Sequence, residues 1–246
     1  MIKEIRVENQ LEPINIIEEN PRFSWVLSDV KRQISYQVIV SSSLNNEGDL
    51  YNSGEVISNK NFDIYYRGSP LKSLQVCYLK VIVKTDKGID VAYSKFEIAL
   101  KEEKDFKAQW IFLPVNHSGG TQYFRKQLEM PVGNIKRARV FLVGLGYSEL
   151  YINGQKVNEN CYLNPGQTSY NETVLYDCYD ILKYLKEEKN VLGVEVGYGW
   201  YGARKIRAYL YIEYEDGTIY EDGTRAGYGW WVAKTPTIYN SVYGGE

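Results

Sequence analysis

Residues 140–170 decide the fold of the second half of the chain, and their sequence is VFLVGLGYSELYINGQKVNENCYLNPGQTSY. A strand pattern over 147–152 is joined by Asn153-Gly154 to Lys156-Val157. Asn-Gly between strands favours a two-residue type I′ turn, because both central residues need a positive φ. The stretch therefore predicts a β-hairpin. After it comes a loop marked by Gly and Pro, whose amides and tyrosines indicate one face of a polar binding surface rimmed by aromatic rings.

Strand patterns flank this hairpin on both sides, with one helix expected among them. The helix candidate is 180–189, DILKYLKEEK, in which Asp180 is suited to cap the first turn and Ile181, Leu182 and Leu185 form a short apolar stripe. The half as a whole predicts a large antiparallel β-sandwich, jelly-roll-like. The expected strands cover 121–130, 137–144, 174–176, 190–196, 208–214, 229–232 and 238–239.

The first half, to about Leu100, reads as about seven short strands separated by turn residues. Turn signals every 8–12 residues are typical of a fibronectin type III or immunoglobulin-like sandwich. Trp25 lies on an early strand, where such sandwiches often bury an indole. Leu74 and Tyr78 open the strongest strand pattern and are similar to a tyrosine corner, in which the Tyr hydroxyl bonds to nearby backbone.

A charged run separates the two halves. Residues 101–107, KEEKDFK, contain no glycine and five charged side chains in the first five positions. Such a run is typical of a solvated linker or face between domains. The sequence therefore predicts an all-β chain with two antiparallel sandwich domains and one short helix, the first domain over 1–103 and the second over 108–246.

Composition narrows the function classes. With 29 basic and 31 acidic residues, the chain offers no electrostatic case for a nucleic-acid partner or an anionic membrane. No apolar run is long enough to span a bilayer. The first residues lack the apolar region of a signal peptide, so a cytoplasmic location is expected, or a secreted or periplasmic one if a signal was removed. Cys77, Cys161 and Cys178 form no CxxC and are expected to be buried, reduced thiols.

Catalytic and metal-binding groups are not apparent in the sequence. His117 is the single histidine and lies in a loop with Gly and Ser, without an evident partner. Most acidic residues fall in turns or charged runs, where they are typically solvated. Glu149 and Glu195 differ, because they lie within strand patterns, but neither has a matching carboxylate that the sequence identifies. We therefore expect no catalytic residues and no metal ligands in this chain.

Nine stretches, taken in order, resemble one family. They are RVEN (6–9), PRFSW (21–25), LYNSGEV (50–56), QWI (109–111), FRK (124–126), ARVFLVGLGYSELYINGQKV (138–157), VLYDCYDI (174–181), NVLGVEVGYGWY (190–201) and YNSVYGGE (239–246). Together they are similar to the N-terminal, non-catalytic region of bacterial α-L-rhamnosidases, inverting glycoside hydrolases. The resemblance implies a fibronectin-like domain, a jelly-roll N-terminal domain and, beyond Glu246, a catalytic (α/α)₆ barrel that carries the acid and base.

The resemblance also suggests a carbohydrate-contact surface on two loops. The 164–170 loop matches a family stretch that reads DPGWTDY. Here Asn164 replaces the first Asp, Gln167 the Trp, and Ser169 the second Asp, which removes charged ligands that calcium would prefer. No cofactor is therefore expected, and calcium binding, if the family's loop has it, is weakened. The expected sugar-contact residues are Asn164, Gln167 and Tyr170 on this loop, and Tyr198, Trp200 and Tyr201 on the GYGWYG loop (197–202).

Two functions remain open from the sequence. The chain is either an accessory module that binds a rhamnose-containing glycan, or a structural module whose Trp200 and Tyr201 pack between the domains or against the catalytic barrel of the parent protein. A self-sufficient hydrolase is not expected, because inverting glycosidases need two carboxylates placed across the sugar.

Overall fold

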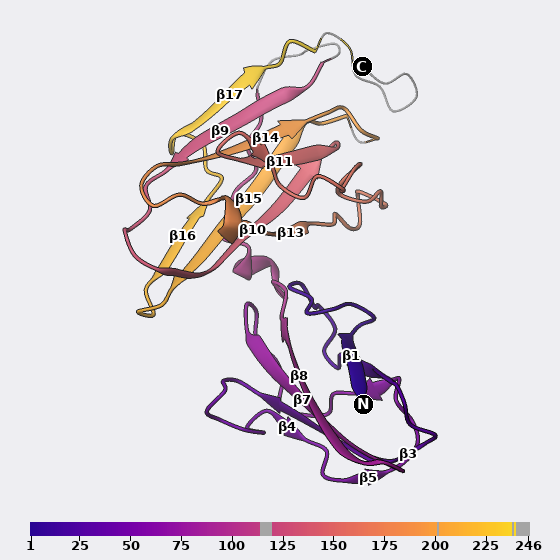
Figure 1. The fold of residues 1–246 in the computed structure, drawn as a ribbon. Helices are drawn as coiled ribbons and strands as arrows, with labels where there is room; N and C mark the ends of the chain where they lie inside the picture. Colours follow the sequence, from indigo (N-terminus) through magenta and orange to yellow (C-terminus); the bar gives the residue numbers. More distant parts are fainter. Residues whose placement is uncertain (114–119, 201, 238, 240–246) are drawn as a thin grey trace. The chain divides into compact units, whose positions relative to one another are not determined.

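The structure is a computed structural model that describes residues 1–113, 120–200, 202–237 and 239. The regular secondary structure of the described chain is almost entirely β-strand, and the chain divides into two compact units, Met1–Asp105 and Phe106–Glu246 (Figure 1). No helix in the described ranges is long and apolar enough to cross a membrane. The all-β fold predicted from the sequence is confirmed.

The first unit is an antiparallel sandwich of two sheets. One sheet has the strand order β1-β2-β6, and the other has the order β4-β3-β7-β8, with β5 also paired to β3. Along β7 buried and partly exposed residues alternate, as expected for a strand with one face in a core. The strands are β1 (Ile2–Val7), β2 (Arg22–Leu27), β3 (Gln33–Ser41), β4 (Tyr51–Asn52), β5 (Val56–Ile57), β6 (Ile64–Tyr65), β7 (Val76–Thr85) and β8 (Gly88–Glu97).

Trp25 is buried in this core, as predicted, but the tyrosine corner expected at Tyr78 does not form among the described contacts. The Trp25 side chain is 2% exposed, and its Nε1–H donates to Gln33 Oε1 at 2.9 Å. Tyr78 is half-exposed on β7, and the described contacts give its hydroxyl no backbone partner. The buried hydroxyl is that of Tyr66, which donates to Ser69 O at 2.6 Å. The prediction for Tyr78 was wrong because the alternation of β7 turns Cys77, not Tyr78, into the core.

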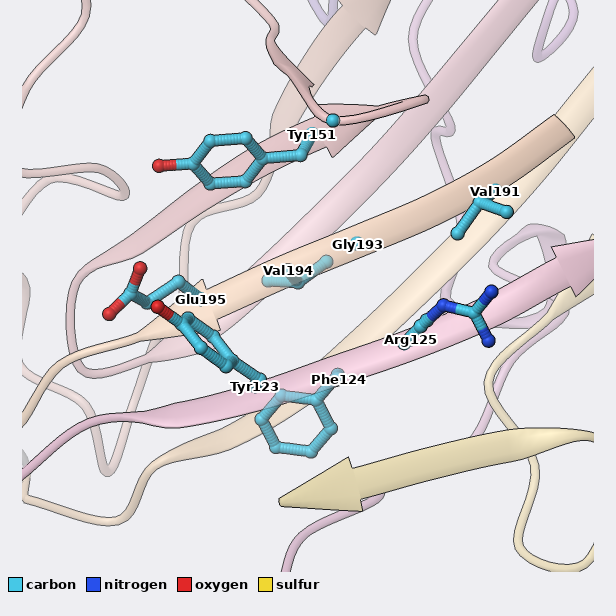
Figure 2. Close-up of a pocket in the computed structure, with 9 residues that line it drawn as sticks. Tyr123, Phe124, Arg125, Tyr151, Val191, Gly193, Val194 and Glu195 are labelled. Atoms are coloured by element: carbon cyan, nitrogen blue, oxygen red, sulfur yellow. The ribbon is translucent and has the colours of Figure 1, made fainter. Parts of the chain in front are cut away.

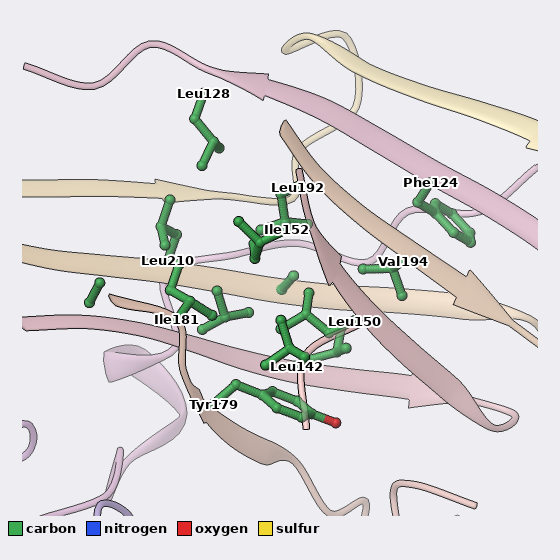
Figure 3. Close-up of a cluster of buried hydrophobic side chains, with 14 of the residues drawn as sticks. Phe124, Leu128, Leu142, Leu150, Ile152, Tyr179, Ile181, Leu192, Val194 and Leu210 are labelled. Carbon is green, nitrogen blue, oxygen red and sulfur yellow. The ribbon is translucent and has the colours of Figure 1, made fainter. Parts of the chain in front are cut away.

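The second unit is a larger, jelly-roll-like sandwich of a four-stranded and a five-stranded sheet, both antiparallel. The strand orders are β13-β10-β15-β16 and β12-β11-β14-β9-β17. Their facing sides enclose one apolar core, which includes Phe124, Leu142, Leu150 and Leu210 (Figure 3). The strands are β9 (Gln122–Leu128), β10 (Ile135–Leu145), β11 (Ser148–Ile152), β12 (Gln155–Lys156), β13 (Asp177–Asp180), β14 (Asn190–Val196), β15 (Lys205–Tyr214), β16 (Ile219–Gly223) and β17 (Trp230–Lys234).

The Asn153-Gly154 hairpin forms as predicted. Both residues have a positive φ, 54° and 81°, and they connect β11 to β12. Asn153 also does more than turn the chain. Its Nδ2 donates to Tyr184 O and to Asn190 Oδ1, each at 2.9 Å, and its Oδ1 accepts the Val191 N–H at 2.9 Å. The hairpin tip is thereby tied to the start of β14.

The helix predicted over 180–189 is only a 3₁₀ turn, η2 (Leu182–Tyr184). Asp180 ends β13 instead of opening a helix, although its Oδ1 does accept the Leu182 N–H at 3.0 Å. The chain leaves the turn at Leu185, which has extended backbone angles, and the Asn190 side chain then accepts the Lys186 N–H at 2.8 Å. The apolar stripe is too short to cover the core as a helix. The strand expected over 174–176 is likewise displaced, to Asp177–Asp180.

Residues on either side of the unit boundary are each held by their own unit. A second 3₁₀ turn, η1 (Glu103–Asp105), ends the first unit, and Ser73 Oγ donates to Asp105 Oδ2 at 2.5 Å. The second unit begins with Phe106. Arg207 of β15 donates from Nη2 to Phe106 O at 2.8 Å and from Nε to Ala108 O at 3.0 Å. The guanidinium of Arg207 also lies 4.7 Å from the centre of the Phe106 ring.

Candidate functional site

Two loops of the second unit meet at the β10–β11 turn, Gly146-Tyr147. Tyr147 O accepts the Gly197 N–H at 2.7 Å, and on the other side of the turn the Ser148 N–H donates to Asn164 O at 2.7 Å. The 164–170 loop and the 197–202 loop thus flank the same turn. We call the predicted residues on them the edge surface, which the structure describes at Asn164, Gln167, Tyr170, Tyr198 and Trp200. Tyr201, the sixth predicted residue, lies outside the described residues, as does His117.

The glycines around this turn allow the backbone of the β10–β11 turn to lie close to the backbone of the 197–202 loop. A Cβ on Gly146, which has a φ of +124°, would lie 2.1 Å from Gly197 O. A Cβ on Gly199 would lie 2.7 Å from the Gly146 Cα. Either contact is far inside van der Waals distance. The absence of a side chain at Gly199 therefore serves close packing against Gly146.

On the 164–170 loop the predicted residues differ in how they are exposed. The Asn164 side chain shares a hydrogen bond with the hydroxyl of Tyr179, a core residue, so the amide is directed inward. Gln167 is exposed. Tyr170 is half-buried; burial, and then the neighbouring Tyr147, raise the pKa of its hydroxyl. Only Gln167 and part of Tyr170 are therefore presented to a ligand from this side.

On the 197–202 loop two aromatic rings are presented. The Tyr198 side chain is 44% exposed and Trp200 is 41% exposed. The Tyr198 ring packs on Gly202, where a Cβ would lie 2.8 Å from Tyr198 Cζ. The Arg204 guanidinium lies 5.3 Å from the centre of the same ring. Tyr198 is thus held in place, and Trp200 offers the larger accessible apolar surface.

A buried carboxyl lies near the edge surface. Asp177 on β13 is half-buried as a residue, but its Oδ2 atom is buried and accepts no hydrogen bond from the described residues. Burial raises the pKa of this carboxyl to about 6. Its charge also helps raise the pKa of the Tyr179 hydroxyl, after the larger effect of burial, so the two groups are neighbours. Among the described residues, no three His, Cys, Asp or Glu side chains gather into a group suited to a metal ion.

The open face of the five-stranded sheet carries a second surface, which the sequence did not reveal. A hollow of about 450 Å³ lies over β11, β14 and β9. Figure 2 shows the Arg125 guanidinium and the Glu195 carboxylate at opposite ends of it, with Gly193 between them. We call this the face hollow. Its lining residues are Tyr123, Phe124, Arg125, Tyr151, Gly154, Val191, Gly193, Val194 and Glu195.

Alternation along the strands was the signal that could have found the face hollow. Tyr123 and Arg125 alternate with buried Phe124, and Glu149 and Tyr151 alternate with buried Leu150. Such alternation places these polar and aromatic side chains on one side of their strand. The sequence does not give the register between strands that places them beside Gly193 and Glu195.

Known proteins resemble both units. Residues 2–102 match the Rha78A-like N-terminal immunoglobulin domain, and residues 133–246 match the alpha-L-rhamnosidase N-terminal domain. An alpha-L-rhamnosidase of Formosa agariphila is 30% identical over 95% of this chain and 28% of its own length. The solved structure of an alpha-L-rhamnosidase from Dictyoglumus thermophilum is 32% identical with a TM-score of 0.89, over 99% of this chain and 31% of that one.

A more distant solved structure shares the fold. The alpha-L-rhamnosidase from Aspergillus terreus has a TM-score of 0.80 at 23% identity, over 99% of this chain and 30% of that one. This chain thus spans about 30% of the length of the relatives it matches.

Proposed function

Because the chain belongs to the N-terminal, non-catalytic region of the α-L-rhamnosidases, we propose that it is an accessory module that binds a rhamnose-containing glycan for a parent glycoside hydrolase. One observation supports carbohydrate binding above the others. The two loops expected to share a surface are both bonded to the turn between β10 and β11, and Tyr198, Trp200 and Gln167 on them are exposed.

The chemistry of this edge surface suits a deoxysugar. Rhamnose has a methyl group and ring C–H groups, which pack well on a flat aromatic face, and hydroxyls, which need hydrogen-bond partners. Trp200 supplies the flat face, and the Gln167 amide supplies both a donor and an acceptor. The substitution of Asp by Asn164, whose amide turns toward Tyr179, leaves a contact surface without a carboxylate at that position.

The test is a titration of this chain with L-rhamnose and with a methyl α-L-rhamnoside, followed by calorimetry and tryptophan fluorescence. Trp200→Ala is expected to weaken binding at least ~10-fold, because stacked aromatic rings are typical anchors of sugar and base ligands. The matched control is Tyr228→Ala, an exposed ring in the loop before β17. No saturable binding of either ligand, or equal binding by Trp200→Ala, would contradict the proposal.

A second function is a docking module for the catalytic barrel of the parent protein. The exposure of Tyr198 and Trp200 favours it, since aromatic rings are enriched at protein interfaces. It predicts that acrylamide quenches Trp200 in this chain but not in the full-length protein, with Trp200→Phe in each identifying the Trp200 signal. Equal quenching in both proteins would exclude docking through this ring.

A further inference from the structure

One row of paired residues crosses all five strands of the sheet that carries the face hollow. Lys156 pairs with Tyr151, Tyr151 with Gly193, Gly193 with Arg125, and Arg125 with Trp231. Paired residues of antiparallel strands have their side chains on the same face. Since Arg125 is exposed, the whole row lies on the open face of the sheet. At about 4.8 Å per strand, Tyr151 and Trp231 are roughly 14 Å apart across it.

Gly193 forms the floor of the hollow, and the backbone does not require a glycine there. Its φ is not positive, and the nearest atom to a Cβ built on it would be Tyr151 Cβ at 3.6 Å, an ordinary contact. Glycine within a strand is otherwise unfavourable, because it loses backbone entropy and packs no side chain. What glycine does provide at this position is open space between Tyr151 and Arg125.

The walls of the hollow are held rigidly on one side. The Tyr151 hydroxyl donates to Glu149 Oε2 at 2.7 Å, and Glu149 is also bonded to Lys156. Burial and then this hydrogen bond raise the pKa of Tyr151 strongly, so its hydroxyl stays protonated. Glu195 accepts a hydrogen bond from Thr121 Oγ1 at 2.6 Å and pairs with Tyr123, whose ring is 43% exposed. Two aromatic rings therefore border the floor, and the ring of Tyr151 is fixed by its hydrogen bond to Glu149.

Arg125 and Trp231 supply the adjustable groups. In the described part of the chain, Arg125 forms no hydrogen bond or ion pair, so its guanidinium has all its donors available. Trp231, its neighbour in the row, is 74% exposed. A planar guanidinium beside a flat ring matches a ligand with hydroxyl groups and an apolar ring face.

The opposite charges of Arg125 and Glu195 disfavour a ligand that carries charge of a single sign. An anionic ligand drawn to Arg125 would meet the carboxylate of Glu195 in the same hollow, and a cationic ligand drawn to Glu195 would meet Arg125 (Figure 2). Hydroxyl groups, which donate and accept, satisfy both ends. We propose that the face hollow is a second carbohydrate-binding site, which takes one residue of a neutral polysaccharide over Gly193 and the next sugars of that chain toward Trp231. This proposal does not depend on the edge surface.

The test is affinity electrophoresis of this chain in gels that contain xyloglucan, galactomannan, arabinan or, as the acidic comparison, polygalacturonate. Retardation is expected in at least one neutral gel and not in polygalacturonate. Arg125→Ala and Trp231→Ala are each expected to weaken binding about 10-fold or more. Arg32→Ala, an exposed arginine of the first unit, is the matched control.

Gly193→Val is the decisive variant, because it fills the floor with a β-branched side chain that strands favour. It is expected to abolish retardation while the urea midpoint of unfolding stays the same or rises. Retardation by Gly193→Val equal to that of the parent chain would overturn the proposal, and so would retention only in polygalacturonate or in no gel. Trp200→Ala should leave retardation unchanged. Loss in Trp200→Ala but not in Gly193→Val would assign binding to the edge surface instead.

Discussion

Glu149 of β11 and Glu195 of β14 lie directly opposite each other on neighbouring antiparallel strands. Like charges in such positions are destabilising unless other groups compensate them. Here Lys156 and Tyr151 bond to Glu149, and Thr121 bonds to Glu195. Burial alone would raise the pKa of the Glu149 carboxyl, but the hydrogen bonds from Lys156 and Tyr151 outweigh it and lower the pKa. Two carboxylates that the sequence left unexplained are thus one compensated pair.

Lys156→Ala should remove most of that compensation. We expect a loss of a few tenths to about 1 kcal/mol in the free energy of unfolding at pH 7, since the pair is partly exposed. A carboxyl whose pKa is lowered by folding stabilises above its unfolded value, 4.5, and loses that contribution as the pH falls through its folded value. The difference between the variant and the parent chain should therefore shrink below pH 4.5 in urea titrations.

Lys189→Ala, at an exposed lysine, is the control for this experiment and should show no such pH dependence. A difference that persists unchanged at pH 3 would mean that Lys156 acts through packing on Tyr162, over whose ring its Nζ lies at 4.9 Å.

Asp177→Asn should remove a loss of stability that the parent chain undergoes as the pH rises. The folded pKa of about 6 lies above the ordinary value of 3.8, so the parent chain loses stability as the pH rises between these values. The loss should be about 1–3 kcal/mol by pH 8. The amide does not ionise, so the variant should match the parent near pH 4 and exceed it at pH 8. Equal pH profiles for the two proteins in urea unfolding would refute this assignment.

Gly146→Ala should be severely destabilising, by at least about 3 kcal/mol, because its Cβ would meet backbone oxygen and no flexible side chain can yield. Gly154→Ala is the matched comparison. Gly154 also has a positive φ, but nothing lies within 4 Å of its Cβ position, so only the backbone cost of about 1–2 kcal/mol applies. Urea midpoints of the two variants measure the difference. Similar costs for both would show that the close approach of Gly146 to the Gly197 carbonyl can relax.

Trp25→Phe should destabilise the first unit by about 1–3 kcal/mol through the loss of the hydrogen bond to Gln33. The smaller ring of Phe adds a further cost, because it leaves space in the core. Gln33 is buried, and the variant leaves its Oε1 without the indole donor. A double-mutant cycle with Gln33→Met isolates the bond, since Gln33 also donates to Ser58 O and Lys60 O. A coupling energy near zero would show that only the volume of Trp25 matters.

The features that were predicted correctly from the sequence are those that depend on residues close together in the chain. Asn153-Gly154 requires a positive φ at two residues, and β7 alternates strictly, so the hairpin and the sandwich followed. At the helix candidate, the local pattern favoured a helix, but Ile181 is buried in the core and Asn190 bonds the chain just after the turn, which leaves only η2. That outcome depends on residues distant in the sequence.

At the candidate sites, too, the sequence indicated local features but not contacts between residues distant in the chain. Tyr198, Trp200 and Gln167 were predicted as one surface, and each of their loops bonds to the 146–148 segment. The sequence could not show that Asn164 turns toward Tyr179. The face hollow depends on the pairing of Gly193 with Tyr151 and Arg125. No pattern within β14 alone indicates which residues of β11 and β9 lie beside it.

The hydrogen bonds of Asp105 and Phe106 indicate where the two units can be separated and joined to other domains. Ser73 holds Asp105, and Arg207 holds Phe106, so the last fixed residue of one unit precedes the first fixed residue of the other. If the chain is divided between Asp105 and Phe106, each unit keeps the hydrogen bonds that hold its own end. A flexible Gly-Ser insertion between Asp105 and Phe106 should leave both unfolding transitions where they are. The same insertion after Phe106 would separate Phe106 from Arg207 and lower the urea midpoint of unfolding of the second unit.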